Sequence, residues 1–248
     1  DFRPELGMGK LFPKDKIADW APACIESGIF KSIDLYGPEV FEGLEDFKPL
    51  YDLAGKCGLK RKAHVGEFSD AKSVKQFIEY FELDEVQHGI GAVQDDKILQ
   101  YIADKKLRCN VTPASNVMLT AVDKLENHPM RKMFDAGVRL TICTDDLIFF
   151  NKTVSEQCVD MVNCGLFTKE EIFACIAHEF GHLKNPLQEY PRGDIKKEVL
   201  ADAYASKLGY QEQMLSVINR FISMKDALNF SESQVDVLNQ RLSILQGQ

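Results

Sequence analysis

Short apolar runs alternate with amphipathic segments along the first 150 residues. Five runs predict β-strands, because β-branched and aromatic residues cluster there between polar turns: 32–36, 59–64, 85–88, 107–111 and 139–144. Between them, apolar residues recur at helical spacing near 16–27, 45–57, 70–82, 95–105 and 128–136. Strands and helices that alternate in this way are typical of βα units around a parallel sheet.

The pattern changes after residue 147, where no further strand is predicted. Thr168 and Glu171 have the spacing of a capping box, which predicts the start of a long helix through Ile176. Two prolines and a glycine predict a loop over 183–195. Further helices are predicted at 196–208, 210–223 and 232–246, the last with a capping box from Ser231 to Gln234. We therefore expect two domains, residues 1–170 and 171–248.

Composition narrows the class of protein. The 248 residues are 45% hydrophobic and 27% charged, which is enough to form a buried core. The net charge of −8 disfavours binding to duplex nucleic acid or an anionic membrane, since both attract basic surfaces. A small molecule, a nucleoside or a peptide is the expected partner.

The seven cysteines are odd in number and contain no CxxC pair. Several of them fall inside apolar stretches, so this usage predicts reduced, buried thiols and a cytoplasmic protein. No apolar run has the length of a membrane span, and no signal peptide precedes the first motif. The sequence begins with Asp1 rather than Met, which suits a fragment or a processed product.

Polar residues stand where successive predicted strands end: Asp34, His64 with Glu67, His88, and Asp145 with Asp146. In a β/α barrel these ends share one face, where catalytic groups collect. Histidine and carboxylate side chains are suitable ligands for Zn²⁺. A glutamate three residues after a ligand histidine is placed to move protons on a substrate.

Six short stretches resemble, in order and spacing, the adenosine deaminase family of the amidohydrolase superfamily: SIDLYGPE at 32–39, HVGE at 64–67, QHG at 87–89, TPASN at 112–116, HP at 128–129 and TDD at 144–146. The resemblance covers residues 1–176 and implies a TIM-type barrel with bound zinc. It implies that His64 and Asp145 bind the metal and that Glu67 protonates a purine ring nitrogen. It further implies that His88 orients the attacking water, Asp146 bonds the substrate ring and Gly37 lies close to the substrate.

The family also uses a His-x-His pair on its first strand, and no histidine precedes His64 here. We therefore expect an α/β fold, a partial TIM-type (β/α) barrel without its first strands, followed by an all-helical zinc module. A second polypeptide or another segment is expected to complete the barrel. Under the alternative interpretation, His64 and His88 are ordinary hydrogen-bonded histidines at strand ends. Whatever the activity, His128 is expected to be a loop or helix-entry residue rather than a ligand.

A second motif, HExxH, places His178 and His182 one helical turn apart, so that both imidazoles can share one zinc ion. With Glu198 and Asp202 in the next predicted helix, residues 172–222 resemble gluzincin metallopeptidases. That resemblance implies three zinc ligands, His178, His182 and Glu198. It implies that Glu179 is the general base and that Asp202 bonds a ligand histidine.

Three functions remain open from the sequence. The first is a zinc metallopeptidase, whose site is complete in this chain. The alternative is a purine deaminase, in which zinc-activated hydroxide attacks an amidine carbon and ammonia is released. The third is a binding or regulatory protein without catalysis. The expected substrate is accordingly a peptide or a purine nucleoside, and Zn²⁺ is the expected cofactor of either enzyme.

Overall fold

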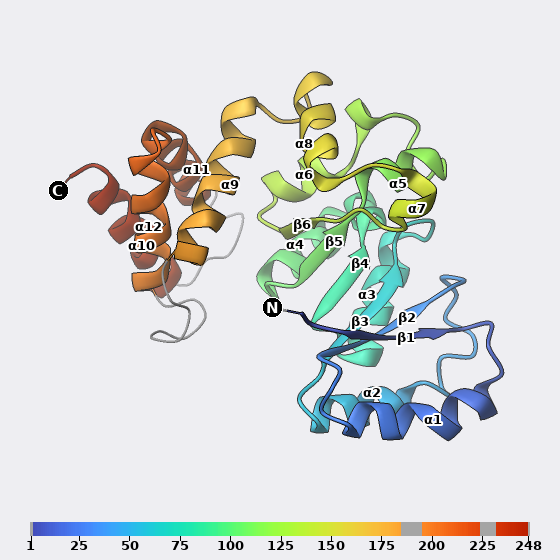
Figure 1. The fold of residues 1–248 in the computed structure, drawn as a ribbon. Coiled ribbons are helices and arrows are strands. Elements are labelled where there is room, and N and C mark those ends of the chain that lie inside the picture. Colours follow the sequence, from blue (N-terminus) through green and yellow to red (C-terminus); the bar gives the residue numbers. More distant parts are fainter. Residues whose placement is uncertain (1, 185–194, 224–231, 248) are drawn as a thin grey trace. The chain divides into compact units, whose positions relative to one another are not determined.

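The structure, a computed structural model, describes residues 2–184, 195–223 and 232–247. Its contacts divide the chain into two compact units, Asp1–Val154 and Ser155–Gln248, which we call unit 1 and unit 2 (Figure 1). The domain boundary expected after residue 170 stays a prediction.

Unit 1 is built on one six-stranded parallel sheet in the order β1-β2-β3-β4-β5-β6. The strands are β1 (Glu5–Gly9), β2 (Ser32–Tyr36), β3 (Lys60–Val65), β4 (Glu85–His88), β5 (Arg108–Val111) and β6 (Arg139–Ile142). The α-helices that follow or connect them are α1 (Lys14–Glu26), α2 (Lys48–Lys56), α3 (Ala71–Phe81), α4 (Asp96–Asp104), α5 (Pro113–Met118), α6 (Met130–Asp135) and α7 (Leu147–Phe150). Two short 3₁₀ helices, η1 (Ile90–Gln94) and η2 (Leu125–Asn127), complete the connections.

The five predicted strands are confirmed to within two residues, whereas the prediction missed β1. Its sequence, ELGMG, has two glycines and no β-branched residue, so it lacks the usual strand signal. The glycines have a packing reason. A Cβ atom at Gly7 or at Gly9 would lie 3.2 Å from the ring of Tyr36 on the neighbouring strand. Glycine at these two positions leaves space for the Tyr36 ring. The β1 sequence therefore lacks the residues from which a strand is usually predicted.

Parallel pairing places the carboxyl ends of all six strands at the same edge of the sheet. Register pairs Gly9 with Tyr36, and Val65 with His88. The predicted site residues that follow β2, β3, β4 and β6 therefore start from one edge, as expected for a βα sheet.

Unit 2 contains only helical secondary structure in the part that the structure describes. The helices are α8 (Val154–Asn163), which begins at the unit boundary, α9 (Lys169–Lys184), α10 (Ile195–Lys207), α11 (Gln211–Ser223) and α12 (Glu232–Leu245). Thr168 and Glu171 form the predicted capping box, with reciprocal hydrogen bonds of 2.9 and 3.1 Å. The second predicted box begins at Ser231, and the predicted loop includes 185–194, both outside the described residues.

A small apolar cluster holds these helices together. It contains Ala174, Ala177, Ala205, Met214, Ile218, Leu238 and Leu245. Gly181 brings α9 close to α10, since a Cβ atom there would lie 2.5 Å from the Cα atom of Ala201. The glycine inside the HExxH motif thus sets the spacing of the two helices that carry the motif and Glu198.

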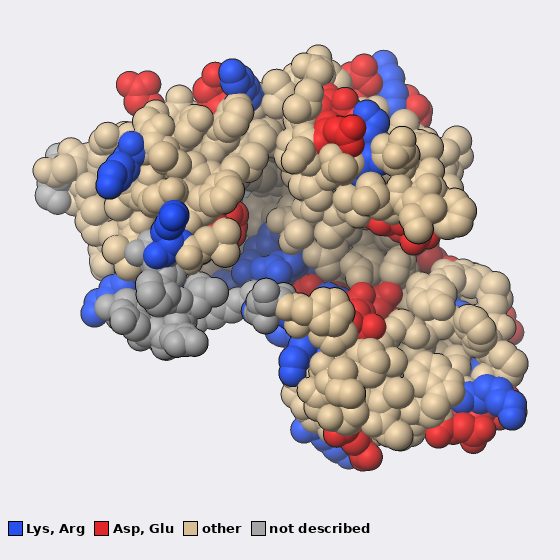
Figure 2. Space-filling view, in the orientation of Figure 1, with Lys and Arg blue, Asp and Glu red and all other residues tan. Residues whose placement is uncertain are grey.

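Surface and thiol properties add two observations. On the face in Figure 2, Lys and Arg side chains of the described residues occur in small groups among Asp and Glu. All seven cysteines are unpaired, although Cys57 and Cys175 are exposed rather than buried as expected.

Among the described helices, none has both the length and the apolar character needed to cross a membrane.

Inside the sheet, Lys62 should contribute more to stability than Lys60 on the same strand. Lys62 Nζ lies 2.8 Å from Glu5 and 3.3 Å from Glu85, and its side chain is 19% exposed. Lys62→Met leaves two carboxylates without this cation, so we expect a loss of about 2 kcal/mol in the free energy of unfolding.

The matched control is Lys60→Met, because Lys60 is 52% exposed and lies 3.5 Å from Asp84. It should change the free energy of unfolding by no more than about 0.5 kcal/mol in urea titrations. Equal effects of the two substitutions would contradict the importance of the internal ion pairs.

Candidate functional site

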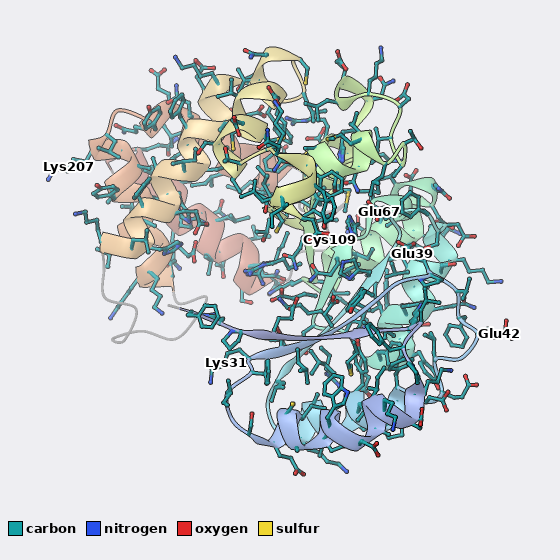
Figure 3. All side chains as sticks on the ribbon, turned by 45° about the vertical axis from the view of Figure 1, so that its right-hand side comes forward. Lys31, Glu39, Glu42, Glu67, Cys109 and Lys207 are labelled. Atoms are coloured by element: carbon teal, nitrogen blue, oxygen red, sulfur yellow. The ribbon has the colours of Figure 1, made fainter. Side chains whose placement is uncertain are left out.

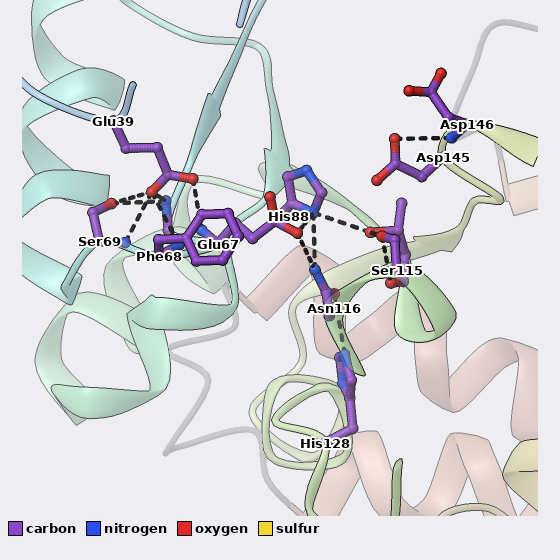
Figure 4. A network of polar contacts seen from close by, with 12 residues as sticks. Glu39, Glu67, Phe68, Ser69, His88, Ser115, Asn116, His128, Asp145 and Asp146 are labelled. Carbon is purple, nitrogen blue, oxygen red and sulfur yellow. Dashed lines mark hydrogen bonds and ion pairs between the residues drawn. The ribbon is translucent and has the colours of Figure 1, made fainter. Parts of the chain in front are cut away.

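A cleft of about 750 Å³ opens at the carboxyl edge of the sheet in unit 1. All six residues that the deaminase resemblance implicated line it: Gly37, His64, Glu67, His88, Asp145 and Asp146. Figure 4 shows part of this cluster, with Glu67 and His88 on one side and Asp145 and Asp146 on the other. Residues spread over more than 100 positions of the chain are thus brought to one cavity.

The backbone turns sharply where two of these residues follow their strands. His88 has φ 64° and Asp145 has φ 57°, in the left-handed region that side chains other than glycine rarely adopt. Such conformations cost energy and persist where the surrounding structure imposes them, which is common at functional sites. Here they direct both side chains from strand ends into the cleft.

Asn116 on α5 is the centre of a directional hydrogen-bond chain. His128 Nδ1 accepts from the backbone N–H of Met130 at 3.1 Å, so its proton lies on Nε2. Nε2 is 3.2 Å from the side-chain oxygen of Asn116, which must therefore accept. The amide nitrogen of Asn116 then donates to Glu67 at 2.7 Å and to His88 Nδ1 at 3.2 Å.

His88 is consequently a neutral imidazole with its proton on Nε2. Burial, together with the charge of His64, lowers its pKa from 6.5 to about 4. Thr112 supports the same arrangement, because its hydroxyl lies 3.0 Å from His88 Nδ1 and can donate to it. Ser115 in turn donates to the Thr112 hydroxyl at 2.7 Å.

Glu67 has the opposite shift. Burial raises its pKa from 4.5 to about 7, the hydrogen bond from Asn116 opposes the rise, and the charges of Asp145 and Glu39 add to it. A carboxyl group with this pKa holds a proton for part of the time near neutral pH. It can therefore act as a general acid there.

His64 and Asp145 are the two metal ligands that the resemblance implies, and both line the cleft. His64 Nδ1 lies at ion-pair distance from Asp34 Oδ2, 2.9 Å away. Among the described residues, neither His64 Nδ1 nor the other Asp34 oxygen, Oδ1, has a hydrogen-bond partner. A carboxylate behind an imidazole is the arrangement that orients a metal-binding histidine. Imidazole and carboxylate groups are donors of the type that zinc binds.

Among the described residues of unit 1, one group of three side chains could hold a metal ion. This group differs from the pair of ligands that the resemblance implies. Carboxylate and imidazole atoms of Glu67, His88 and Asp145 lie within 4.8 Å of one another, and His64 is outside this group. Asn116 already bonds Glu67 and His88, so these two are committed to the hydrogen-bond chain. The metal roles of His64 and Asp145 stay predictions.

Sequence reasoning gave no role to Asn116 or Thr112, although both lie in the TPASN stretch that carried the resemblance, and it named Asp34 only among the polar residues at strand ends. Their shared signal is a polar side chain in a segment next to a buried strand. His128 is 2% exposed and lies two residues before the start of α6. Its position agrees with its interpretation as a helix-entry residue.

In unit 2 the structure brings the HExxH histidines and Glu198 together. His178 Nε2 lies 3.1 Å from His182 Nε2 and 3.3 Å from Glu198, and His182 Nε2 lies 3.9 Å from Glu198. Ligand atoms around tetrahedral zinc are about 3.3 Å apart for bonds of about 2.0 Å. The three groups therefore fit a single ion, with Glu179 on the same helix and exposed.

Asp202 holds this cluster from behind. It lies 2.9 Å from His178 Nδ1, which leaves Nε2 for a metal. Arg241 on α12 donates to both oxygens of Asp202, at 2.7 and 2.9 Å. Burial opposes protonation of His178, but its hydrogen bonds to Asp202 and Glu198 raise its pKa to about 9.

A parallel βα sheet with histidine and carboxylate side chains at the carboxyl ends of its strands is the arrangement in which β/α-barrel enzymes collect their catalytic groups. The profile of the Adenosine deaminase family matches residues 10–178. The chain belongs to the adenosine deaminase family.

Individual relatives agree with this family. A protein of Treponema pallidum (strain Nichols), assigned as an adenosine/adenine deaminase, is 57% identical over 173 residues, 70% of this chain and 58% of the relative. Adenosine deaminase of Clostridium acetobutylicum is 34% identical over 141 residues, 57% of this chain and 42% of that protein. The chain thus spans about half the length of the curated relatives it matches.

Solved structures support the fold. Adenine deaminase from Arthrobacter aurescens aligns with a TM-score of 0.67 and 25% identity, over 83% of this chain and 61% of that structure. An amidohydrolase from Burkholderia ambifaria with bound Zn aligns with a TM-score of 0.62 and 20% identity, over 84% and 56%. The α/β fold with a parallel sheet that resembles a partial TIM barrel is therefore confirmed.

The expected gluzincin segment receives no support from these comparisons, so a metallopeptidase activity stays a prediction. An alignment over 83% of the chain is longer than the 154 residues of unit 1, so deaminase-like structure extends into the helices of unit 2. The described residues of unit 2 form helices, but the comparisons show no separate zinc module.

Glu67 should make stability depend on pH in a defined direction. Its folded pKa of about 7 exceeds its ordinary value of 4.5, so the folded state retains a proton that the unfolded state has lost. This contribution is fully present below pH 4.5 and is lost as the pH rises through 7, by up to about 3 kcal/mol.

The measurement is the free energy of unfolding from pH 4 to 8 with chelator, for the wild type and Glu67→Gln. The difference between them should fall over that window, while Glu126→Gln, at an exposed position, should show no such trend. A difference that does not change with pH would contradict the raised pKa.

Proposed function

We propose that unit 1 carries part of the catalytic site of a purine deaminase that acts on adenine or adenosine. The observation that carries the proposal is the convergence of all six implicated residues on one cleft, with Glu67 and His88 held by one asparagine. The relatives' assigned activities support the substrate class.

The reaction replaces the exocyclic amino group of the purine by oxygen, with water consumed and ammonia released. A zinc ion held by His64 and Asp145, with further ligands, would supply an activated water at neutral pH. Glu67 donates its proton to a ring nitrogen, which makes the adjacent amidine carbon more electrophilic. His88 and Asp146 line the same cleft and orient water and substrate, and Gly37 leaves room for the purine.

The direct test is ammonia release by the full chain, purified with Zn²⁺ and given adenine or adenosine. Glu67→Gln should lower kcat by about 10²- to 10⁴-fold, as expected for a general acid. Glu126→Gln, an exposed matched control, should retain wild-type kcat. Absence of ammonia from both substrates in the zinc-loaded wild type would reject deamination by this chain.

We infer a second candidate function for unit 2, a hydrolytic zinc centre, from the convergence of His178, His182 and Glu198. Three protein ligands leave a coordination position for water, and Glu179 on the same helix is the candidate general base. A peptide bond is the candidate substrate, as the HExxH arrangement is suited to its hydrolysis. The geometry supports this function, whereas the comparisons do not.

Zinc content of the full chain distinguishes the two candidate metal sites. His178→Ala should lose the ion of unit 2, and His64→Ala should keep it. Glu179→Gln should keep the ion and lose cleavage of a peptide library. Affinity should fall at acid pH, because both imidazoles must be unprotonated to bind. Unchanged zinc content and affinity in His178→Ala would rule out this centre.

A further inference from the structure

The connection from β3 to α3 carries Glu67, and its backbone N–H groups need a hydrogen-bond acceptor from elsewhere in the chain. Strand β3 ends at Val65, and α3 begins at Ala71. The Asp70 side chain caps α3 by accepting from Ser73 N–H at 2.8 Å. The four N–H groups at 66–69 precede this cap, so the helix cannot satisfy them.

A single carboxylate from another part of the chain accepts all four. Glu39 Oε2 lies 2.7 Å from the N–H of Gly66, 3.3 Å from Phe68 and 2.9 Å from Ser69, and Oε1 lies 3.0 Å from the N–H of Glu67. The Ser69 hydroxyl adds a fifth bond at 2.5 Å. Successive N–H groups that point at one anion form a nest, here occupied by a side chain of the same protein (Figure 4).

Glu39 is itself held from the opposite side. It follows β2, and Lys10 donates to the carbonyl oxygens of its two neighbours, at 2.5 Å for Pro38 and 3.1 Å for Val40. The backbone on both sides of Glu39 is therefore bonded to Lys10, the residue after β1. The carboxylate cannot follow a displaced loop without breaking these bonds.

The loop also has little freedom to move toward its other neighbours. Gly66 has φ 78°, and a Cβ atom there would lie 2.4 Å from Val74 on α3. Its carbonyl oxygen accepts from Gly91 N–H at 2.7 Å. The loop is thus packed between α3 and η1, and its hydrogen bonds to Glu39 set the backbone position of Glu67.

We propose that Glu39 is a positioning residue for deamination: its carboxylate fixes the backbone of residues 66–69 and thereby holds Glu67 against Asn116 and His88. This inference rests on the proposed deaminase function. Glu39 acts through the loop. The Glu67 carboxyl must stay 2.7 Å from the Asn116 amide to have a defined direction toward the substrate.

Glu42 offers a matched control three residues further along the same segment. It is exposed and lies at the outer edge of unit 1, away from Glu39 and Glu67 (Figure 3). Glu39→Gln retains the size of the side chain but replaces one acceptor oxygen by a donor, which opposes the N–H groups of the loop. Glu42→Gln makes the same chemical change without these contacts.

The first measurement is amide hydrogen exchange in the full chain, which does not depend on activity. In Glu39→Gln, exchange at residues 66–69 should accelerate at least about tenfold, because charge-assisted hydrogen bonds are lost. Exchange in α4 should stay unchanged, which excludes general destabilisation. Ser69→Ala, which removes one donor to Glu39 and a second acceptor of the Gly66 N–H, should give a smaller acceleration, and Glu42→Gln none. Unchanged exchange at 66–69 in Glu39→Gln would overturn the proposal.

The second measurement is a double-mutant cycle in kcat. Glu39→Gln alone should lower kcat about tenfold or more, with a smaller change in KM. In a Glu67→Gln background the same substitution should change kcat by less than about twofold, because its effect passes through Glu67. Equal losses in both backgrounds would show a general structural role and overturn the proposal. A wild type without activity but with the exchange result above would reject the deaminase function, not the control of the loop by Glu39.

Discussion

Unit 1 depends on one constraint, the parallel pairing of six strands in the order of the sequence. Because every strand runs in the same direction, each βα connection leaves the sheet at the same edge, and polar residues that are far apart in sequence meet there. His88 and Asp145, which both have left-handed backbone conformations, lie in the cleft at this edge.

The two polar clusters have opposite electrostatics. At Glu67 and His88 in the cleft of unit 1, burial dominates, so the pKa of Glu67 is raised and that of His88 is lowered, and both tend toward neutral forms. In unit 2, burial also opposes charge, but ion pairs outweigh it, so the pKa of His178 is raised and that of Asp202 is lowered. Groups that are neutral and have pKa values near the working pH are suited to proton transfer. Carboxylates that orient imidazoles are suited to metal binding.

Much of the fold and of the deaminase cluster could be predicted from residue patterns. The alternation of apolar runs located five of six strands, and β1 escaped because Gly7 and Gly9 serve the packing of Tyr36. The motifs predicted Glu67, His88 and Asp145 as site residues, and the structure places all three at the cleft. They did not identify Asn116 or Glu39, whose roles arise from contacts across 49 and 27 to 30 positions of the chain. The HExxH spacing predicted two neighbouring imidazoles, and the comparisons did not support the peptidase family inferred from it.

By itself, the sequence determined the βα alternation, the family and the residue types that gather at the strand ends, because these follow from local periodicity and short motifs. Tertiary structure alone decided the direction of the Asn116 amide, the protonation of Glu67 and His88, and the attachment of the 66–69 loop to Glu39. The physical reason is that hydrogen-bond direction and burial are properties of neighbours in space, and distant parts of the chain become neighbours only in the folded protein.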